Sequence, residues 1–176
     1  MQLQLIKPSI IIDFQSDTDQ RYTPFSEVEK VRLALGGAIG LDPCSNPGKT
    51  IAAHHHITES DDCFSTDWRQ FLTSLPTAFM NPPYSNSAPF IAEWCKHLES
   101  GDIHAGVTLT LAGLVFNKST QGLVKTHAKA ICFPFGRINF VGGGNSNDRD
   151  VVYILWGKNA DIDLFKKHMT GLVAIL

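Results

Sequence analysis

The sequence has few cysteines, and their spacing excludes two kinds of site. Cys44, Cys63, Cys95 and Cys132 lie far apart, with no CxxC pair among 176 residues, so we expect neither a cysteine zinc site nor a dense disulfide framework. We predict free thiols, mostly buried. No apolar run approaches the roughly 20 residues of a membrane span, and residues 1–14 lack the basic flank and cleavage site of a secretion signal. We therefore expect a cytoplasmic protein.

A large excess of charge of one sign is also absent, but the charges are unevenly distributed. The formal net charge is −2. Residues 51–100 contain two basic and six acidic side chains, whereas residues 101–150 contain five basic and three acidic. The second segment is suited to facing phosphates. The alternative is that its basic side chains are ordinary solvated charge.

The length and the 43% hydrophobic content predict one domain, residues 1–176, with a single core. Thr23 is expected to cap a helix that begins at Pro24 and stops at Gly36-Gly37. Apolar patterning predicts strands at 39–43, 78–81, 105–111 and 151–156, a helix from Pro89 to Gly101 and a last helix over 162–169. This alternation indicates an α/β fold with a mostly parallel central sheet and helices on both faces.

Ligands of such folds bind at the carboxyl ends of the strands, and two predicted loops lie there. One is Asp42–Gly48 and the other is Asn81-Pro82-Pro83-Tyr84-Ser85. Residues 47–50 end like a phosphate-binding loop, but its first glycine would fall at Pro43, so we reject that interpretation. The His54-His55-His56 run is interpreted as a polar strand or loop rather than a metal site, because no further ligand lies nearby in the sequence.

The second loop suits methyl transfer to an amine whose lone pair is delocalised into a ring. Two acceptors on the amine hydrogens would turn that lone pair toward an electrophilic methyl group, and the Asn81 side-chain oxygen and the Pro82 carbonyl are two such acceptors. Pro82 and Pro83 restrict the backbone and hold that carbonyl in place. Tyr84 can stack on a base turned out of a duplex. The alternative is a proline-rich turn in which Tyr84 only packs.

Several motifs together resemble a known family. They are Tyr22-Thr23-Pro24, Leu41-Asp42-Pro43-Cys44, Asp62 with Trp68, Asn81–Ser85, and Gly136–Gly142. This set resembles the phage-type DNA N6-adenine methyltransferase (Dam) family over most of the chain. The resemblance implies a Rossmann-like S-adenosylmethionine-dependent methyltransferase fold, S-adenosylmethionine as methyl donor, no metal, and adenine in double-stranded DNA as acceptor. It also implies a bacterial host cytoplasm if the chain is phage or prophage encoded.

The resemblance assigns roles to individual residues. Thr23 and Pro24 would flank the methionine end of the cofactor, Asp42 and Pro43 would lie in the cofactor loop with Asn81 beside them, and Asp62 would read the adenine of the donor. Closely spaced glycines, usual in such a loop, are missing from Asp42–Gly48. An Asx turn is the alternative for Asp42, and a loop or helix-cap carboxylate is the alternative for Asp62.

The candidates for DNA contact are Ser85, Lys118 and Arg137, with ordinary surface charge as the alternative for Arg137. Residues 117–150 are expected to form a DNA-contacting loop region, because no separate recognition domain fits in the remaining length. Gly142-Gly143-Gly144-Asn145 is either a loop that orders on DNA or a simple hairpin connection.

Two rival functions use the same features. An enzyme that methylates protein glutamine side chains could use the same loop, because an amide nitrogen is also planar and delocalised. The non-enzymatic rival is a DNA-binding module of the same fold that performs no methyl transfer. Salt-dependent DNA binding and cofactor affinity would separate these from the DNA methyltransferase.

Overall fold

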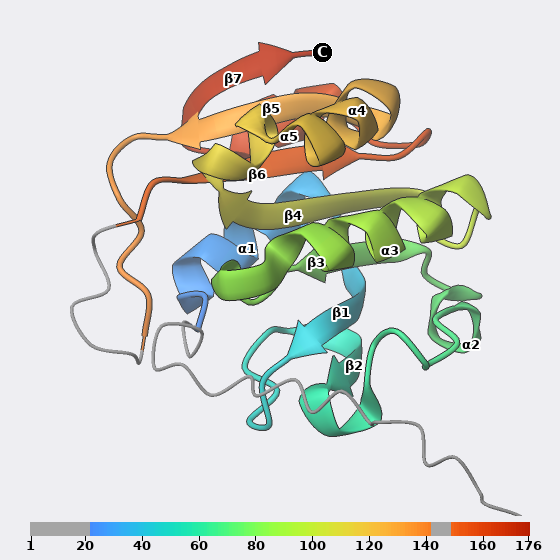
Figure 1. Cartoon of the computed structure of the whole chain (residues 1–176). Coiled ribbons are helices and arrows are strands. Elements are labelled where there is room, and N and C mark those ends of the chain that lie inside the picture. Colours follow the sequence, from blue (N-terminus) through green and yellow to red (C-terminus); the bar gives the residue numbers. More distant parts are fainter. Residues whose placement is uncertain (1–21, 142–148) are drawn as a thin grey trace, which may run out of the picture.

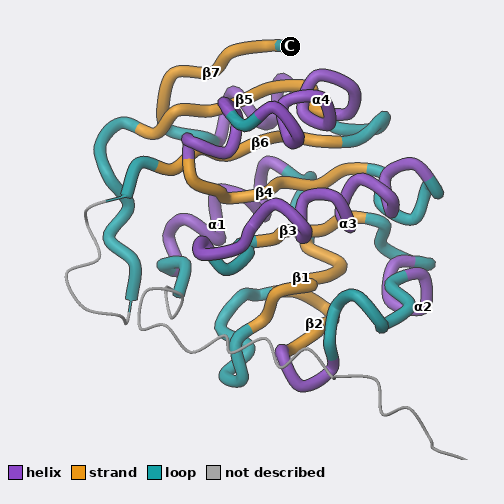
Figure 2. The backbone as a smooth tube through the Cα atoms, in the orientation of Figure 1, coloured by secondary structure: helices purple, strands orange, loops and turns teal. Residues whose placement is uncertain are grey.

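The computed structural model describes residues 22–141 and 149–176, and it has a seven-stranded sheet with helices on both faces (Figures 1 and 2). Residues 1–14 and Gly142–Asn145, discussed above, lie outside the described residues. The strands are β1 Ile39–Ser45, β2 Ala53–Thr58, β3 Thr77–Met80, β4 Ala105–Leu111, β5 Ala128–Pro134, β6 Val151–Trp156 and β7 Gly171–Ile175. The α-helices are α1 Phe25–Ala34, α2 Arg69–Leu72, α3 Ser87–Glu99, α4 Lys118–His127 and α5 Ile162–His168. Three short 3-10 helices are η1 Glu59–Asp61, η2 Tyr84–Asn86 and η3 Ala112–Phe116.

The sheet has a parallel half and an antiparallel half. Its strand order is β2-β1-β3-β4-β6-β5-β7. The pairs β1–β2, β1–β3 and β3–β4 are parallel, whereas β4–β6, β5–β6 and β5–β7 are antiparallel. The α/β class is confirmed, but the expectation of a mostly parallel sheet is wrong for the second half. There β6 inserts between β4 and β5 in the opposite direction, which alternation of hydrophobic segments could not reveal.

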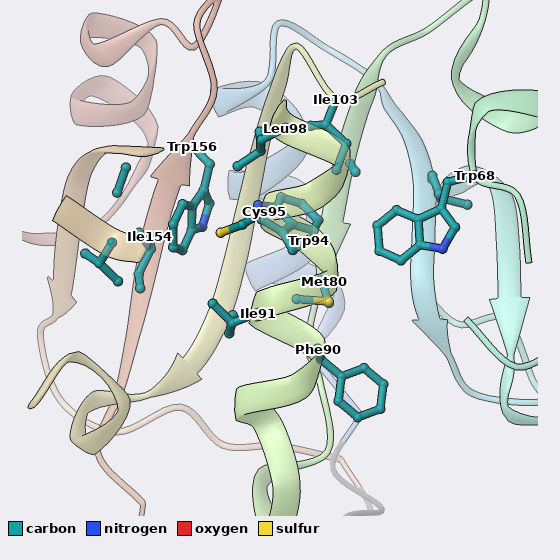
Figure 3. Close-up of a cluster of buried hydrophobic side chains, with 14 of the residues drawn as sticks. Trp68, Met80, Phe90, Ile91, Trp94, Cys95, Leu98, Ile103, Ile154 and Trp156 are labelled. Carbon is teal, nitrogen blue, oxygen red and sulfur yellow. The ribbon is translucent and has the colours of Figure 1, made fainter. Parts of the chain in front are cut away.

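Two apolar cores cover the two faces of the sheet. The first packs α3 and α4 against the sheet and contains Trp94 and Trp156 (Figure 3). The second packs α1 and α5 against the opposite face. All six residues of β6 are buried, as predicted for a strand covered on both faces. In β4 the alternating threonines are also buried, and Trp156 Nε1 donates to Thr108 Oγ1 at 2.9 Å.

Two local expectations need correction. Pro24, not Thr23, occupies the N-cap position of α1, and its carbonyl accepts from the backbone N–H groups of Glu27 and Val28. The expected loop over residues 117–150 instead contains α4 and β5, which leaves only 135–150 between β5 and β6. Small and polar residues in this segment, such as Gly122, weakened the periodic signal. The His54–His56 run lies in β2, so the strand interpretation is confirmed.

Candidate active site

The order of the strands brings the two predicted loops together. β1 has β2 on one side and β3 on the other, both parallel to it, with Leu41 opposite Ala78. After β2 the chain crosses to the other side of β1 to form β3, so the order in which strands are added reverses next to β1. Such switch points form ligand crevices at the carboxyl ends of the strands. β1 runs two residues further than predicted, to Ser45, so the first half of the loop expected over Asp42–Gly48 belongs to the strand. Asp42 and Pro43 are buried in it.

The Asn81-Pro82-Pro83-Tyr84 segment follows β3 directly, as predicted. β3 ends at the fully buried Met80. Asn81 Nδ2 donates to Thr23 Oγ1 at 3.1 Å, and Thr23 is only 5% exposed. This bond fixes the orientation of the Asn81 amide, with its oxygen directed away from Thr23.

Tyr84 contacts a residue to which the sequence assigned no role. The Phe140 ring lies edge-on to the Tyr84 ring, with centroids 6.0 Å apart and an interplanar angle of 81°. Tyr22 and Val141 form an antiparallel bridge with backbone N–H···O distances of 2.9 and 3.0 Å. This bridge holds the segment before α1 beside the end of the Gly136–Gly142 motif. The position of Phe140 inside that motif was the only signal for it.

Asp42 carries the most unusual charge of the site. Its Oδ1 accepts from the Cys44 N–H at 3.2 Å, so the local turn contact foreseen as an alternative is present. Its Oδ2 is buried without a hydrogen-bond partner among the described residues. Burial in low dielectric disfavours the charged form and raises the pKa of Asp42 to about 7, opposed chiefly by the hydrogen bond from the Cys44 N–H. A buried carboxylate with an unused oxygen is suited to a cationic or N–H-donating ligand.

The segment after β2 lies against the end of β1. Burial, and then the neighbouring Cys63 thiol, raise the pKa of Cys44 well above its usual value. The four cysteines are free thiols and three are buried, as predicted. Asp62 itself is exposed. Its Oδ1 accepts from the Phe64 N–H at 3.0 Å and its Oδ2 from the Ser65 hydroxyl at 2.8 Å, so both oxygens serve a local turn.

The candidates for DNA contact are all exposed and lie on three different loops or helix starts. Ser85 belongs to η2 beside the Asn81 loop, and Lys118 begins α4. Arg137 follows β5, and its Nε contacts Asp150 Oδ1 at 3.2 Å. Both partners of this ion pair are largely exposed, so it contributes little to stability and can exchange for another anion.

The comparisons with known proteins agree with this geometry. Within residues 22–141 and 149–176, no helix is long and apolar enough to cross a membrane, and no group of three or more His, Cys, Asp or Glu side chains is placed to hold a metal ion. No curated protein matches the chain. The family model of the DNA N-6-adenine-methyltransferases (Dam) matches residues 13–158, which is more than four fifths of the 176 residues. The chain therefore belongs to the DNA N-6-adenine-methyltransferase (Dam) family.

Proposed function

We propose that the protein transfers a methyl group from S-adenosylmethionine to the N6 amine of adenine in double-stranded DNA. The observation that carries this proposal is the place of Asn81-Pro82-Pro83-Tyr84. It follows the buried strand β3, next to the buried Asp42 of β1 and at the switch point of the sheet. The membership of the chain in the DNA N-6-adenine-methyltransferase family supports the same reaction.

The residues at the end of β1 fit the proposed cofactor. S-adenosylmethionine carries an α-ammonium group and, when bound, supplies an electrophilic methyl group on a sulfonium sulfur. Asp42 Oδ2 is a buried acceptor without a partner among the described residues, so an ammonium group would satisfy it. Thr23, Pro24, Pro43 and Asn81 border the same edge of the sheet, and we assign them with Asp42 to the cofactor site. Asp62 is assigned to the donor's adenine, although its oxygens would then have to leave their turn contacts.

The chain then acts on the adenine by positioning. The target adenine is turned out of the duplex, the Asn81 Oδ1 and the Pro82 carbonyl accept its two amine hydrogens, and the nitrogen lone pair is thereby aimed. The Asn81–Thr23 bond holds the amide ready for this contact. Tyr84 stacks on the base, while Phe140 braces the Tyr84 ring edge-on. Preorganised contacts of this kind supply most of the rate, because the protein does not reorganise during the reaction.

The experiment is transfer of labelled methyl from S-adenosylmethionine to unmethylated duplex DNA, followed by nucleoside analysis. We expect label in N6-methyladenine. Asn81→Ala should lower turnover by the equivalent of about 3 to 4 kcal/mol of barrier, as for loss of one preorganised polar contact. The matched control is Asn86→Ala, because Asn86 is exposed and makes no capping hydrogen bond at the start of α3.

The outcomes separate the rival functions. Asn81→Ala with wild-type turnover would contradict the catalytic assignment. Label recovered on glutamine side chains of added protein, with none on DNA, would support the protein-directed enzyme. Salt-dependent DNA binding without any thermal shift by S-adenosylhomocysteine would support the non-catalytic module.

A further inference from the structure

Phe116 is an unusually exposed aromatic side chain at the end of the short helix η3. It is 80% exposed, the highest fraction among the large apolar side chains of the described residues. The backbone around it is fixed: the Thr120 hydroxyl donates to the Leu114 carbonyl, and Leu114 is buried. Asn117 caps α4 by accepting from the Ser119 N–H at 3.1 Å. A large apolar side chain held out in water on a rigid base indicates a contact surface.

The strand that leads to Phe116 lies next to the strand that leads to the Asn81 loop. β4, which leads to Phe116, is the direct parallel neighbour of β3, and Met80 pairs with Thr108. Adjacent strands lie about 4.8 Å apart, and each further residue of a strand adds about 3.3 Å. β3 ends at Met80, whereas β4 continues for the three residues from Leu109 to Leu111, or roughly 10 Å. Phe116 therefore lies at the end of η3, which follows a strand whose carboxyl end lies at the same side of the sheet as the proposed catalytic loop, one strand away.

The charge around Phe116 fits a polyanion. Residues 103–147 contain no aspartate or glutamate. Lys118 stands in the first turn of α4, where the helix N-terminus also favours negative groups. Phosphates on either side of an inserted side chain would meet both Lys118 and the N-terminus of α4.

We propose that Phe116 inserts into the base stack and fills the gap left by the adenine that enters the Asn81 loop. The inference rests on the proposed function and deepens it. Apolar side chains are used as wedges between base steps by other DNA-binding proteins, and turning out a base leaves a vacancy that such a wedge can occupy. Phe116 then acts as a positioning residue, because it touches the DNA but not the reacting atoms.

Two other exposed phenylalanines lie near this edge and are less suited. Phe25 is 73% exposed, but the cations that follow it on α1, Lys30 and Arg32, are already in ion pairs with Glu27 and Glu29. Phe135 is 78% exposed, but it follows β5, which is separated from β4 by β6. Phe135 also lies in the segment 135–150 that remains a candidate for DNA contact, so the control for Phe116→Ala is Leu172→Ala: Leu172 is 67% exposed and lies on β7, the edge strand furthest from β3 and β4 on that side of the sheet.

The test uses duplexes that carry one target adenine, at a site first mapped by sequencing methylated plasmid DNA. In one duplex the adenine is paired with thymine, and in the other it faces an abasic position, so that turning it out breaks no base pair. Single-turnover methylation and the fluorescence of 2-aminopurine at the target position are measured for each variant. Thermal unfolding checks that each variant is folded.

We expect Phe116→Ala to slow methylation of the paired target by about tenfold to a hundredfold, because the lost wedge was worth a few kcal/mol. The loss should shrink below about threefold on the abasic duplex, and the 2-aminopurine signal should fall. Leu172→Ala should match the wild type. Equal rates for Phe116→Ala and the wild type on paired DNA would overturn the inference, as would an equal loss on both duplexes. Wild-type protein that methylates neither duplex would overturn the proposed function and the inference with it.

Discussion

Asp42 combines two properties that rarely occur together in one carboxylate. It is fully buried in β1, and one of its oxygens lacks a hydrogen-bond partner among the described residues. A group left in this condition lowers the stability of the ligand-free protein when it is ionised, because the hydrogen bond from the Cys44 N–H to Oδ1 compensates only part of its desolvation. Such a deficit is typical of a site that is completed by a ligand.

This burial predicts a pH dependence of stability. The pKa of Asp42 is raised to about 7 in the folded protein and is about 3.9 in an unfolded chain. The folded state therefore keeps a proton that the unfolded state has lost, so stability should fall as the pH rises from about 4 to about 7 and then level off. Asp42→Asn should remove this fall in the free energy of unfolding, which we expect to be on the order of 2 to 4 kcal/mol.

The measurement is urea unfolding of the cofactor-free protein at pH 5 and pH 8, for the wild type and for Asp42→Asn. Comparing the two proteins cancels the contribution of other titrating groups. The same difference between the two pH values in both proteins would contradict the assignment.

At the scale of elements, the contact between α3 and the sheet positions the proposed catalytic loop, since α3 begins directly after η2. Gly106 of β4 allows this approach: a Cβ added there would lie 2.4 Å from the Trp94 ring. Gly106→Ala should therefore destabilise the protein by about 1 to 3 kcal/mol through overpacking. Gly113→Ala is the control, because no atom lies within 4 Å of a Cβ at that position. Chemical denaturation that gives equal midpoints for both variants would contradict this packing.

The elements also differ in how far the sequence could predict them. β3, β4, β6 and α3 have long or regular apolar patterns, and all four were predicted within a few residues of their bounds. α4 and β5 were missed because α4 buries few side chains and β5 begins with small residues. β7 is short and half-exposed, so its pairing with β5 depends on long-range contacts and not on its own pattern.

The candidate site was likewise predictable only in part. Asn81-Pro82-Pro83-Tyr84 could be placed after a strand because β3 is apolar and the prolines end it. The contacts Asn81–Thr23 and Tyr84–Phe140 join segments more than 50 residues apart. Only the fold reveals such contacts, since no local pattern records which distant side chain meets a loop.

For the whole molecule, the distribution of charge matters more than its sum. A net charge of −2 predicts no attraction to DNA, yet residues 103–147 carry basic side chains and no carboxylate, and they supply both Phe116 and Lys118 in the segment that follows β4. We therefore expect duplex binding whose affinity falls steeply with salt, because each neutralised phosphate releases counterions.

Lys118→Gln tests whether that surface is the one that binds. It should weaken binding to all duplex sequences alike and should reduce the slope of log affinity against log salt by about 1. Lys158→Gln is the matched control: Lys158 is exposed just after β6, whose last residue Trp156 pairs with Gly106 near the start of β4, at the opposite edge of the sheet. Fluorescence anisotropy with a labelled duplex at several salt concentrations measures both slopes. If Lys158→Gln changed the slope and Lys118→Gln did not, the DNA would bind the opposite edge, and the proposed roles of Asn81 and Phe116 would fail together.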